Sequence, residues 1–207
     1  MKSIVSAAAA LLLLVSLPAS ADKPKFEPYR SEVIAIQTDG ECHWWRAGCP
    51  RDPEGLPPEA PRQGTVITVD TGANVAYLYR DGALVLKGAA ATGMDKMLTK
   101  GLRKWLFRTP RGRHRIVRKV VDPIWVKPDW AFIEEGKAIP PQNARSRRVP
   151  GKLGRYALDL GDGIMIHGTD DPTSLGRKVS HGCIRVGDEL LKKMYRASDV
   201  GTEVWIF

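Results

Sequence analysis

Two histidines, a cysteine and an arginine lie near the C-terminal end of the sequence. His167 ends a short apolar run, and Cys183 stands in the segment Ser180-His181-Gly182-Cys183-Ile184-Arg185. A thiol in water is mostly protonated at neutral pH, so a nucleophilic cysteine needs a nearby base or a positive electrostatic environment. His167, His181 and Arg185 supply both, and the segment therefore predicts Cys183 as a nucleophile.

Gly182 directly precedes this cysteine. A residue without a side chain lets a substrate carbonyl approach the backbone closely. We therefore expect the amides of Gly182 and Cys183 to point at a developing oxyanion, a contact that stabilises a transition state by roughly 3 kcal/mol.

Each of these residues also has a structural interpretation. A lone cysteine is often a small core residue, but Cys183 lies in a polar loop that contains glycine. His181 serves either in catalysis or as a hydrogen-bonding structural histidine. Arg185 either acts at the site or forms an ion pair with Asp188 or Glu189.

Short β-strand signals repeat from about Gly64 to the end of the sequence. Asp81-Gly82 and Asp162-Gly163 stand between apolar runs, as expected of tight hairpin turns. A helix is predicted over Asp188 to Ala197, because its apolar residues share one face and Asp188 can cap it. The pattern indicates a mainly antiparallel β-fold, with strands predicted over 65–69, 75–79, 83–87, 114–121, 156–160, 164–167 and 202–207.

Met94 to Leu106 spaces apolar side chains among basic ones, as an amphipathic helix would, although Gly101 interrupts the pattern. Its apolar stripe indicates either packing against the sheet or a membrane-facing role.

The segment around Cys183 resembles the signature of the YkuD-type L,D-transpeptidases, together with His167-Gly168 upstream. The resemblance extends to the Asn74 to Gly93 hairpin, the turn from Arg108 to Gly112 and the end of the chain, and covers about 64–207. It implies a mainly β-fold, a sandwich-like or barrel-like mixed sheet with one or two short helices. Between Gly93 and Thr109 the sequence departs from the family, which generally has a short turn there.

The resemblance also implies a reaction without a metal or another cofactor, and susceptibility to carbapenems. Cys183 would attack a peptidoglycan stem peptide after its third residue, expel the terminal D-alanine and pass the acyl group to an amine on another stem. His167 would act as base and then acid, with the carbonyl of Gly168 orienting its ring. In addition, Ser180 and His181 would line the site, and Arg185 would hold a substrate carboxylate.

Three alternatives to this reaction remain at this point. The same thioester could pass to water, which would make the protein a carboxypeptidase or peptidoglycan hydrolase. A non-catalytic wall-binding protein could keep the fold, but it would not need Cys183 and His167. A general secreted cysteine protease would carry other local signatures.

The N-terminus predicts export. Lys2 precedes an apolar run that is too short to span a bilayer and ends in Ala19-Ser20-Ala21, as in a cleaved signal peptide. An uncleaved anchor helix is the alternative. We therefore expect a signal peptide over 1–21, a proline-rich extension over 22–63 that cannot hold a sheet ladder, and a catalytic domain over 64–207. The mature chain, with no further apolar span, would lie in the periplasm, the cell wall or outside the cell.

The sequence has three cysteines. In an oxidising compartment two of three tend to pair, and Cys42 and Cys49 are close enough to close a small loop. Cys183 would then be the free thiol. A zinc site on Cys42, His43 and Cys49 is the alternative, with a poor set of ligands.

Positive charge is concentrated in one segment. The chain has a formal net charge of +9, and Met94 to Lys119 contains ten Lys or Arg against Asp95 alone. Such a field attracts polyanions, which for an exported protein are an anionic wall or envelope surface rather than nucleic acid. A solvated loop is the simpler interpretation.

Overall fold

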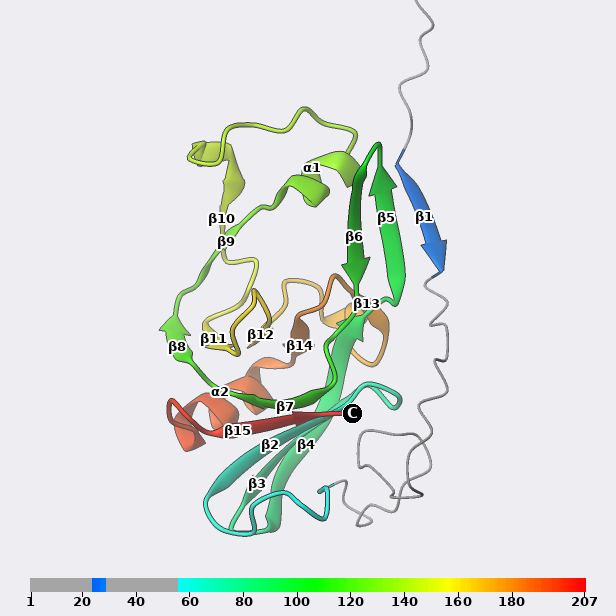
Figure 1. Ribbon diagram of the computed structural model, residues 1–207. Coiled ribbons are helices and arrows are strands. Elements are labelled where there is room, and N and C mark those ends of the chain that lie inside the picture. The colour runs from blue at the N-terminus through cyan, green and yellow to red at the C-terminus, as the bar shows by residue number, and fades with distance from the viewer. Residues whose placement is uncertain (1–23, 29–55) are drawn as a thin grey trace, which may run out of the picture.

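The computed structural model describes residues 24–28 and 56–207, which form a mainly β structure, as the sequence predicts. The largest sheet has ten strands and curls through the lower and middle parts of the molecule (Figure 1). In spatial order it contains β7 (Gly112–Arg115), β15 (Glu203–Ile206), β2 (Thr65–Asp70), β3 (Val75–Arg80), β4 (Ala83–Gly93), β14 (Ile184–Val186), β12 (Met165–His167), β11 (Tyr156–Asp159) and β8 (Arg118–Val121), with β13 (Lys178–Ser180) paired to β4.

Two smaller sheets and the helices complete the described part. The smaller sheets contain β1 (Lys25–Pro28), β5 (Lys96–Lys100) and β6 (Arg103–Phe107), and β9 (Ile124–Val126) with β10 (Arg148–Pro150). The helices are α1 (Asp129–Glu134) and α2 (Asp188–Ala197), with 3₁₀ turns η1 (Arg145–Arg147) and η2 (Pro172–Ser174).

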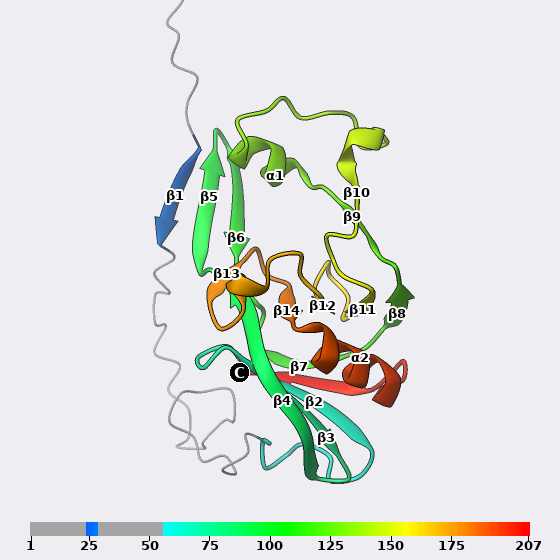
Figure 2. The same ribbon diagram turned by 180° about the vertical axis from the view of Figure 1, so that it is seen from behind.

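The main core lies between the large sheet and α2, which crosses the sheet in the view from behind (Figure 2). Helix α2 has the bounds that the sequence predicts, and its apolar residues Leu190, Leu191 and Met194 are buried. They pack with strand residues such as Ile166 and Ile184, both fully buried. Since burial of each such side chain stabilises the fold by about 2 kcal/mol, this layer fixes the central strands.

A second cluster extends the packed region before Gly64. Leu56 and Ala60 are buried against Tyr79, Trp205 and other apolar residues of the sheet. The end of the proline-rich segment therefore packs on the domain. Its earlier part also forms a strand: β1 pairs with β5 from Lys25 to Pro28. The prediction that the segment holds no ladder is wrong here, because Pro28 stands at the end of the strand, where a missing N–H is tolerated.

The amphipathic pattern of Met94 to Leu106 does not form a helix. The segment is a hairpin of β5 and β6 in which Leu98 pairs with Trp105. Gly101 has φ of +57° and makes the two-residue turn, a conformation that favours glycine. The apolar residues at Leu98, Trp105 and Phe107 share one face of the hairpin, which packs against Ile133 of α1.

Two further differences concern 114–121 and α1. The predicted single strand is divided: β7 pairs with β15, whereas β8 pairs with β11. The break at the buried Ile116 lets the chain cross from one end of the curled sheet to the other. Helix α1 is not among the sequence predictions, because its six residues are too few to show a helical period.

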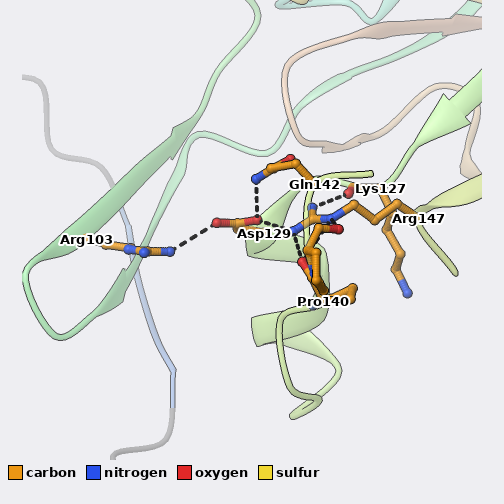
Figure 3. A network of polar contacts seen from close by, with 7 residues as sticks. Arg103, Lys127, Asp129, Pro140, Gln142 and Arg147 are labelled. Atoms are coloured by element: carbon orange, nitrogen blue, oxygen red, sulfur yellow. Dashed lines mark hydrogen bonds and ion pairs between the residues drawn. The ribbon is translucent and has the colours of Figure 1, made fainter. Parts of the chain in front are cut away.

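A buried arginine holds α1 and the loop that follows it (Figure 3). Arg147 is 1% exposed and donates to the carbonyls of Pro140 and Lys127 and to the Asp129 carboxylate, at 2.7, 2.8 and 2.6 Å. Asp129 also accepts from Arg103 of β6 at 3.0 Å. One guanidinium fork thus joins α1, the 140–147 loop and, through Asp129, the hairpin.

We expect Arg147→Ala to lower the free energy of unfolding by about 3 kcal/mol, because it leaves buried carbonyls without a donor. The exposed neighbour Arg145 provides the control, since Arg145→Ala should change stability by less than about 0.5 kcal/mol. Chemical denaturation measures both. Equal stability of the two variants would show that the network does not stabilise the fold.

Two sequence predictions fall outside the described residues: the signal peptide over 1–21 and the pairing of Cys42 with Cys49. Within 24–28 and 56–207, no helix has the length and apolarity needed to cross a membrane.

Candidate active site

The parallel pairing of β12 with β14 brings the predicted site residues together. Ile166 pairs with Ile184 and His167 with Arg185. Side chains alternate between the two faces of a strand, so the isoleucines enter the core and His167 and Arg185 lie on the opposite face. Cys183, which directly precedes β14, has the same parity as Arg185. The sheet therefore places the imidazole and the guanidinium on one face, and the charge of Arg185 acts on both the His167 imidazole and the Cys183 thiol.

The thiol of Cys183 makes its hydrogen bonds with backbone groups. It donates to the carbonyl of Gly163 at 3.4 Å and accepts from the backbone of Met165. Among the described residues it has no hydrogen bond with His167. Burial raises the pKa of the Cys183 thiol, while the Met165 contact and the nearby Arg185 lower it to a smaller extent. The Cys183 side chain is therefore a neutral thiol at physiological pH.

His167 is buried, with 5% of its surface exposed, and its Nδ1 lies 2.6 Å from the carbonyl oxygen of Gly168. A carbonyl only accepts hydrogen bonds, so Nδ1 carries the proton and Nε2 keeps its lone pair. Burial lowers the pKa of His167 to about 4, against an opposing effect of the Gly168 hydrogen bond. The imidazole is thus neutral at physiological pH and has one nitrogen that can accept a proton.

The backbone of the catalytic loop, residues 180–183, requires the glycine at 182. Gly182 has φ of +132°, and a Cβ built there would lie 3.2 Å from the carbonyl oxygen of Arg108. The close approach of a substrate is one expected reason for this glycine. The structure supplies a second reason, since the loop also has to pack closely against the Arg108 backbone.

Ser180 closes the loop on itself. Its hydroxyl donates to the carbonyl of Cys183 at 2.5 Å and accepts from the N–H of Gly182 at 3.2 Å. The expectation that both loop amides point at an oxyanion therefore needs revision, because the Gly182 amide already has a partner. The amide of Cys183 has no hydrogen-bond acceptor among the described residues.

Thr109 anchors the loop from another strand connection. The buried hydroxyl of Thr109 donates to the carbonyl of Gly182 at 2.8 Å and accepts from the N–H of Gly93 at 2.8 Å. The N–H of Met94 donates to the carbonyl of Ser180 at 2.9 Å. The end of β4 and the turn after β6 thus hold the two sides of the catalytic loop.

His181 points away from the sheet toward α1. Its Nε2 lies 2.8 and 3.0 Å from the two carboxylate oxygens of Glu134. Its ring stacks on Trp130 at 3.9 Å between centroids and meets the edge of Phe107 at 4.5 Å. Of the two interpretations of His181, catalytic or structural, this geometry favours a structural, hydrogen-bonding histidine.

Arg185 has no ion pair with a side chain of the described residues, and the alternative pairing with Asp188 or Glu189 is not observed there. Its charge lowers the pKa values of both His167 and Cys183. The guanidinium therefore favours the thiolate and disfavours the imidazolium, and remains available for an anionic substrate group.

Sequence reasoning missed Thr109, Trp130 and Glu134. Thr109 lies in the turn quoted for the resemblance, but nothing in the sequence shows that it reaches Gly182. Asp129 after Pro128 is a helix-start signal that could have marked α1. The contact of Glu134 with His181 joins residues 47 positions apart and could not be inferred from spacing.

A pocket of about 340 Å³ lies on the Arg108 side of the catalytic loop. Thr109 connects it to the carbonyl of Gly182. Neither Cys183 nor His167 lines it; the lining residues are Thr71, Thr92, Gly93, Asp95, Arg108, Thr109 and Arg111.

Two curated relatives are similar in sequence to part of this chain. A probable L,D-transpeptidase, ErfK/SrfK, from Salmonella typhimurium is 29% identical over 153 residues, which cover 72% of this chain and 45% of the relative. A putative L,D-transpeptidase from Fuscovulum blasticum is 34% identical over 105 residues, 46% of this chain and 49% of that protein. The chain thus spans less than half the length of these relatives.

Solved structures share the fold. An L,D-transpeptidase from Xylanimonas cellulosilytica superposes with a TM-score of 0.52 at 19% identity, over 70% of this chain and 61% of that chain. One from Mycobacterium smegmatis gives 0.50 at 22% identity, over 69% and 58%. The sequence profile described as YkuD, L,D-transpeptidase catalytic domain, matches residues 64–206. With this match over most of the chain, the protein belongs to the YkuD family of L,D-transpeptidase catalytic domains.

Proposed function

We propose that this protein is a peptidoglycan L,D-transpeptidase that uses Cys183 as its nucleophile and His167 as its acid–base group. The observation that supports the proposal is the pairing of β12 with β14, which sets His167 beside Arg185, two residues after Cys183, in a member of this family. The names of its relatives as probable L,D-transpeptidases support the reaction class. The products would be cross-links between third residues of stem peptides, or an envelope protein attached to a stem.

Both reacting groups start neutral, so the proton has to move during attack. Nε2 of His167 would take the thiol proton as Sγ bonds to the carbonyl carbon of the third residue. Thiolate and imidazolium attract each other strongly in a buried site, and Arg185 adds to the stabilisation of the thiolate. The opposite charges thus offset part of the unfavourable transfer to a histidine whose pKa is about 4.

The remaining steps return the site to its starting state. The amide of Cys183 would donate to the oxyanion of the tetrahedral intermediate. Collapse breaks the peptide bond and leaves a thioester, while His167 gives its proton to the amine of the departing D-alanine. An acceptor amine then attacks the thioester and loses a proton to His167, which returns it to the thiol.

The hairpin of β5 and β6 is the candidate docking surface. Five of the ten cations between Met94 and Lys119 form ion pairs with described carboxylates: Arg103, Arg108, Arg113, Arg115 and Arg118. Lys96, Lys100 and Lys104 of the hairpin have no such pair among the described residues. We propose that these three lysines hold the enzyme on the anionic sacculus, outside the cytoplasm, where its substrate lies.

Cys183→Ala should abolish turnover of a purified disaccharide-tetrapeptide while leaving the fold intact, because the thiol forms the covalent intermediate. Mass spectrometry of the products, with circular dichroism as the folding control, measures both effects. A cross-linked dimer from the parent supports transpeptidation, whereas a tripeptide alone would identify a carboxypeptidase. Cross-linking by the folded variant would exclude Cys183 as the nucleophile.

His167 should make the fold sensitive to acid. Its pKa falls from 6.5 to about 4 on folding, so its stabilising contribution is complete above pH 6.5 and disappears as the pH drops to about 4. The loss should reach about 3 kcal/mol over this window. Urea unfolding of the parent and of His167→Asn at several pH values isolates the effect. Parallel pH profiles for the two proteins would contradict it.

Replacing Lys96, Lys100 and Lys104 by Gln should weaken binding to purified sacculi at low salt. The Debye length is about 8 Å at physiological ionic strength and longer at low salt, so the contribution of these charges to binding is largest there. Alkylation of Cys183 should be unchanged. The control removes the same charge from α2 by Lys192→Gln, Lys193→Gln and Arg196→Gln. If both triple variants sediment with sacculi to the same extent across a salt titration, the hairpin is not the docking surface.

A further inference from the structure

The carboxylate of Glu134 contacts the catalytic loop from a different part of the chain. It accepts a hydrogen bond from Nε2 of His181 at 2.8 Å, with its second oxygen at 3.0 Å. The two side chains are 22% exposed each, so this is a partly buried contact rather than a mobile surface pair. It joins the helix α1 to a loop residue two positions before Cys183.

The His181 ring is held on more than one side. Trp130 stacks on it at an interplanar angle of 15°, and Phe107 of the hairpin meets it edge-on. Phe107 and Trp130 also contact each other, with centroids 5.2 Å apart. These contacts fix the plane of the imidazole, and the hydrogen bond to Glu134 fixes its rotation.

This hydrogen bond also determines which proton His181 carries. A carboxylate only accepts hydrogen bonds, so Nε2 of His181 holds its proton and does not act as a base. With that nitrogen bound to Glu134 and the ring stacked on Trp130, the proposed acid–base step is assigned to His167, whose Nε2 has a lone pair. The role of His181 has to be sought in what its position does to the backbone beside it.

That backbone carries the groups that react. Residues 181–183 form no regular secondary structure, and their geometry depends on contacts at three points. Ser180 donates to the carbonyl of Cys183, and Thr109 donates to the carbonyl of Gly182. Glu134 holds the side chain of His181. Because an oxyanion donor has to be aimed within tenths of an ångström, the contact of Glu134 with His181 affects the direction of the Cys183 amide.

We propose that Glu134 is a positioning residue for acyl transfer, which acts through His181 to fix the catalytic loop and the direction of the Cys183 amide. The inference rests on the proposed function for its effect on rate. The segment that departs from the family's short turn, together with α1, then becomes part of the active-site framework. Arg147 and the cluster of Leu98, Phe107 and Ile133 hold α1 in the position from which Glu134 reaches the loop.

The test compares two reactions of the same thiol in full-length mature protein. Acylation by a carbapenem develops an oxyanion, whereas alkylation by iodoacetamide does not. Glu134→Ala should slow acylation by about tenfold, less than the loss of an entire oxyanion donor, and leave alkylation within about twofold. Glu134→Gln, which keeps an oxygen that accepts from Nε2, should recover most of the rate.

The neighbouring residue of the same type provides a matched control. Glu135 forms ion pairs with Lys127 and Lys137 and has no contact with the catalytic loop among the described residues. Glu135→Ala and Glu135→Gln should therefore react with both reagents like the parent. Thermal melts of all variants show whether a slow reaction reflects unfolding.

Hydrogen exchange provides a readout that does not require activity. In Glu134→Ala the amides of 180–184 should exchange faster than in the parent or in Glu135→Ala. Acylation and exchange equal to those of Glu135→Ala would overturn the proposal, and equal slowing of acylation and alkylation would overturn it in favour of an effect of charge on the thiol. A parent protein that forms no acyl-enzyme would contradict the proposed function, and exchange would then decide on Glu134 alone.

Discussion

The parallel pairing of β12 with β14 is the contact on which the site depends. It buries Ile166 and Ile184 on the face that packs against α2 and leaves His167 and Arg185 on the other, with Cys183 directly before β14. A slip of one residue would exchange the two faces and place an imidazole and a guanidinium in the apolar core. The hydrophobic pattern of two short strands thus fixes the positions of His167 and Arg185 as well as the fold.

Burial has opposite consequences for the two reacting groups. It lowers the pKa of His167 to about 4 and raises that of Cys183, so both are neutral at rest. A neutral imidazole with its proton fixed on Nδ1 by Gly168 is ready to accept a proton, while a neutral thiol is protected from unproductive chemistry. In the proposed reaction the thiolate then forms only when a substrate occupies the site and attack begins.

The segment between β4 and β11 adds a framework around this centre. A hairpin, a short helix and a buried arginine connect it internally, and Glu134 and Thr109 connect it to the loop that carries Cys183. Several of its arginines are paired with carboxylates, whereas the three hairpin lysines have no such pair among the described residues. This segment therefore combines packing near Cys183 with a basic surface.

The sequence by itself determined the local features. Alternating apolar residues predict most of the strands, and the apolar face of Asp188 to Ala197 predicts α2 with its observed bounds. The spacing of His167 and Cys183 indicates the chemistry. Only the tertiary structure decided whether Met94 to Leu106 is helix or hairpin, because its apolar residues suit both until α1 and β1 pack against them. It also decided the roles of Glu134, Thr109 and Arg147, whose partners lie far away along the chain. Such contacts depend on how the strands pair and curl, and the spacing of residues along the chain does not predict that geometry.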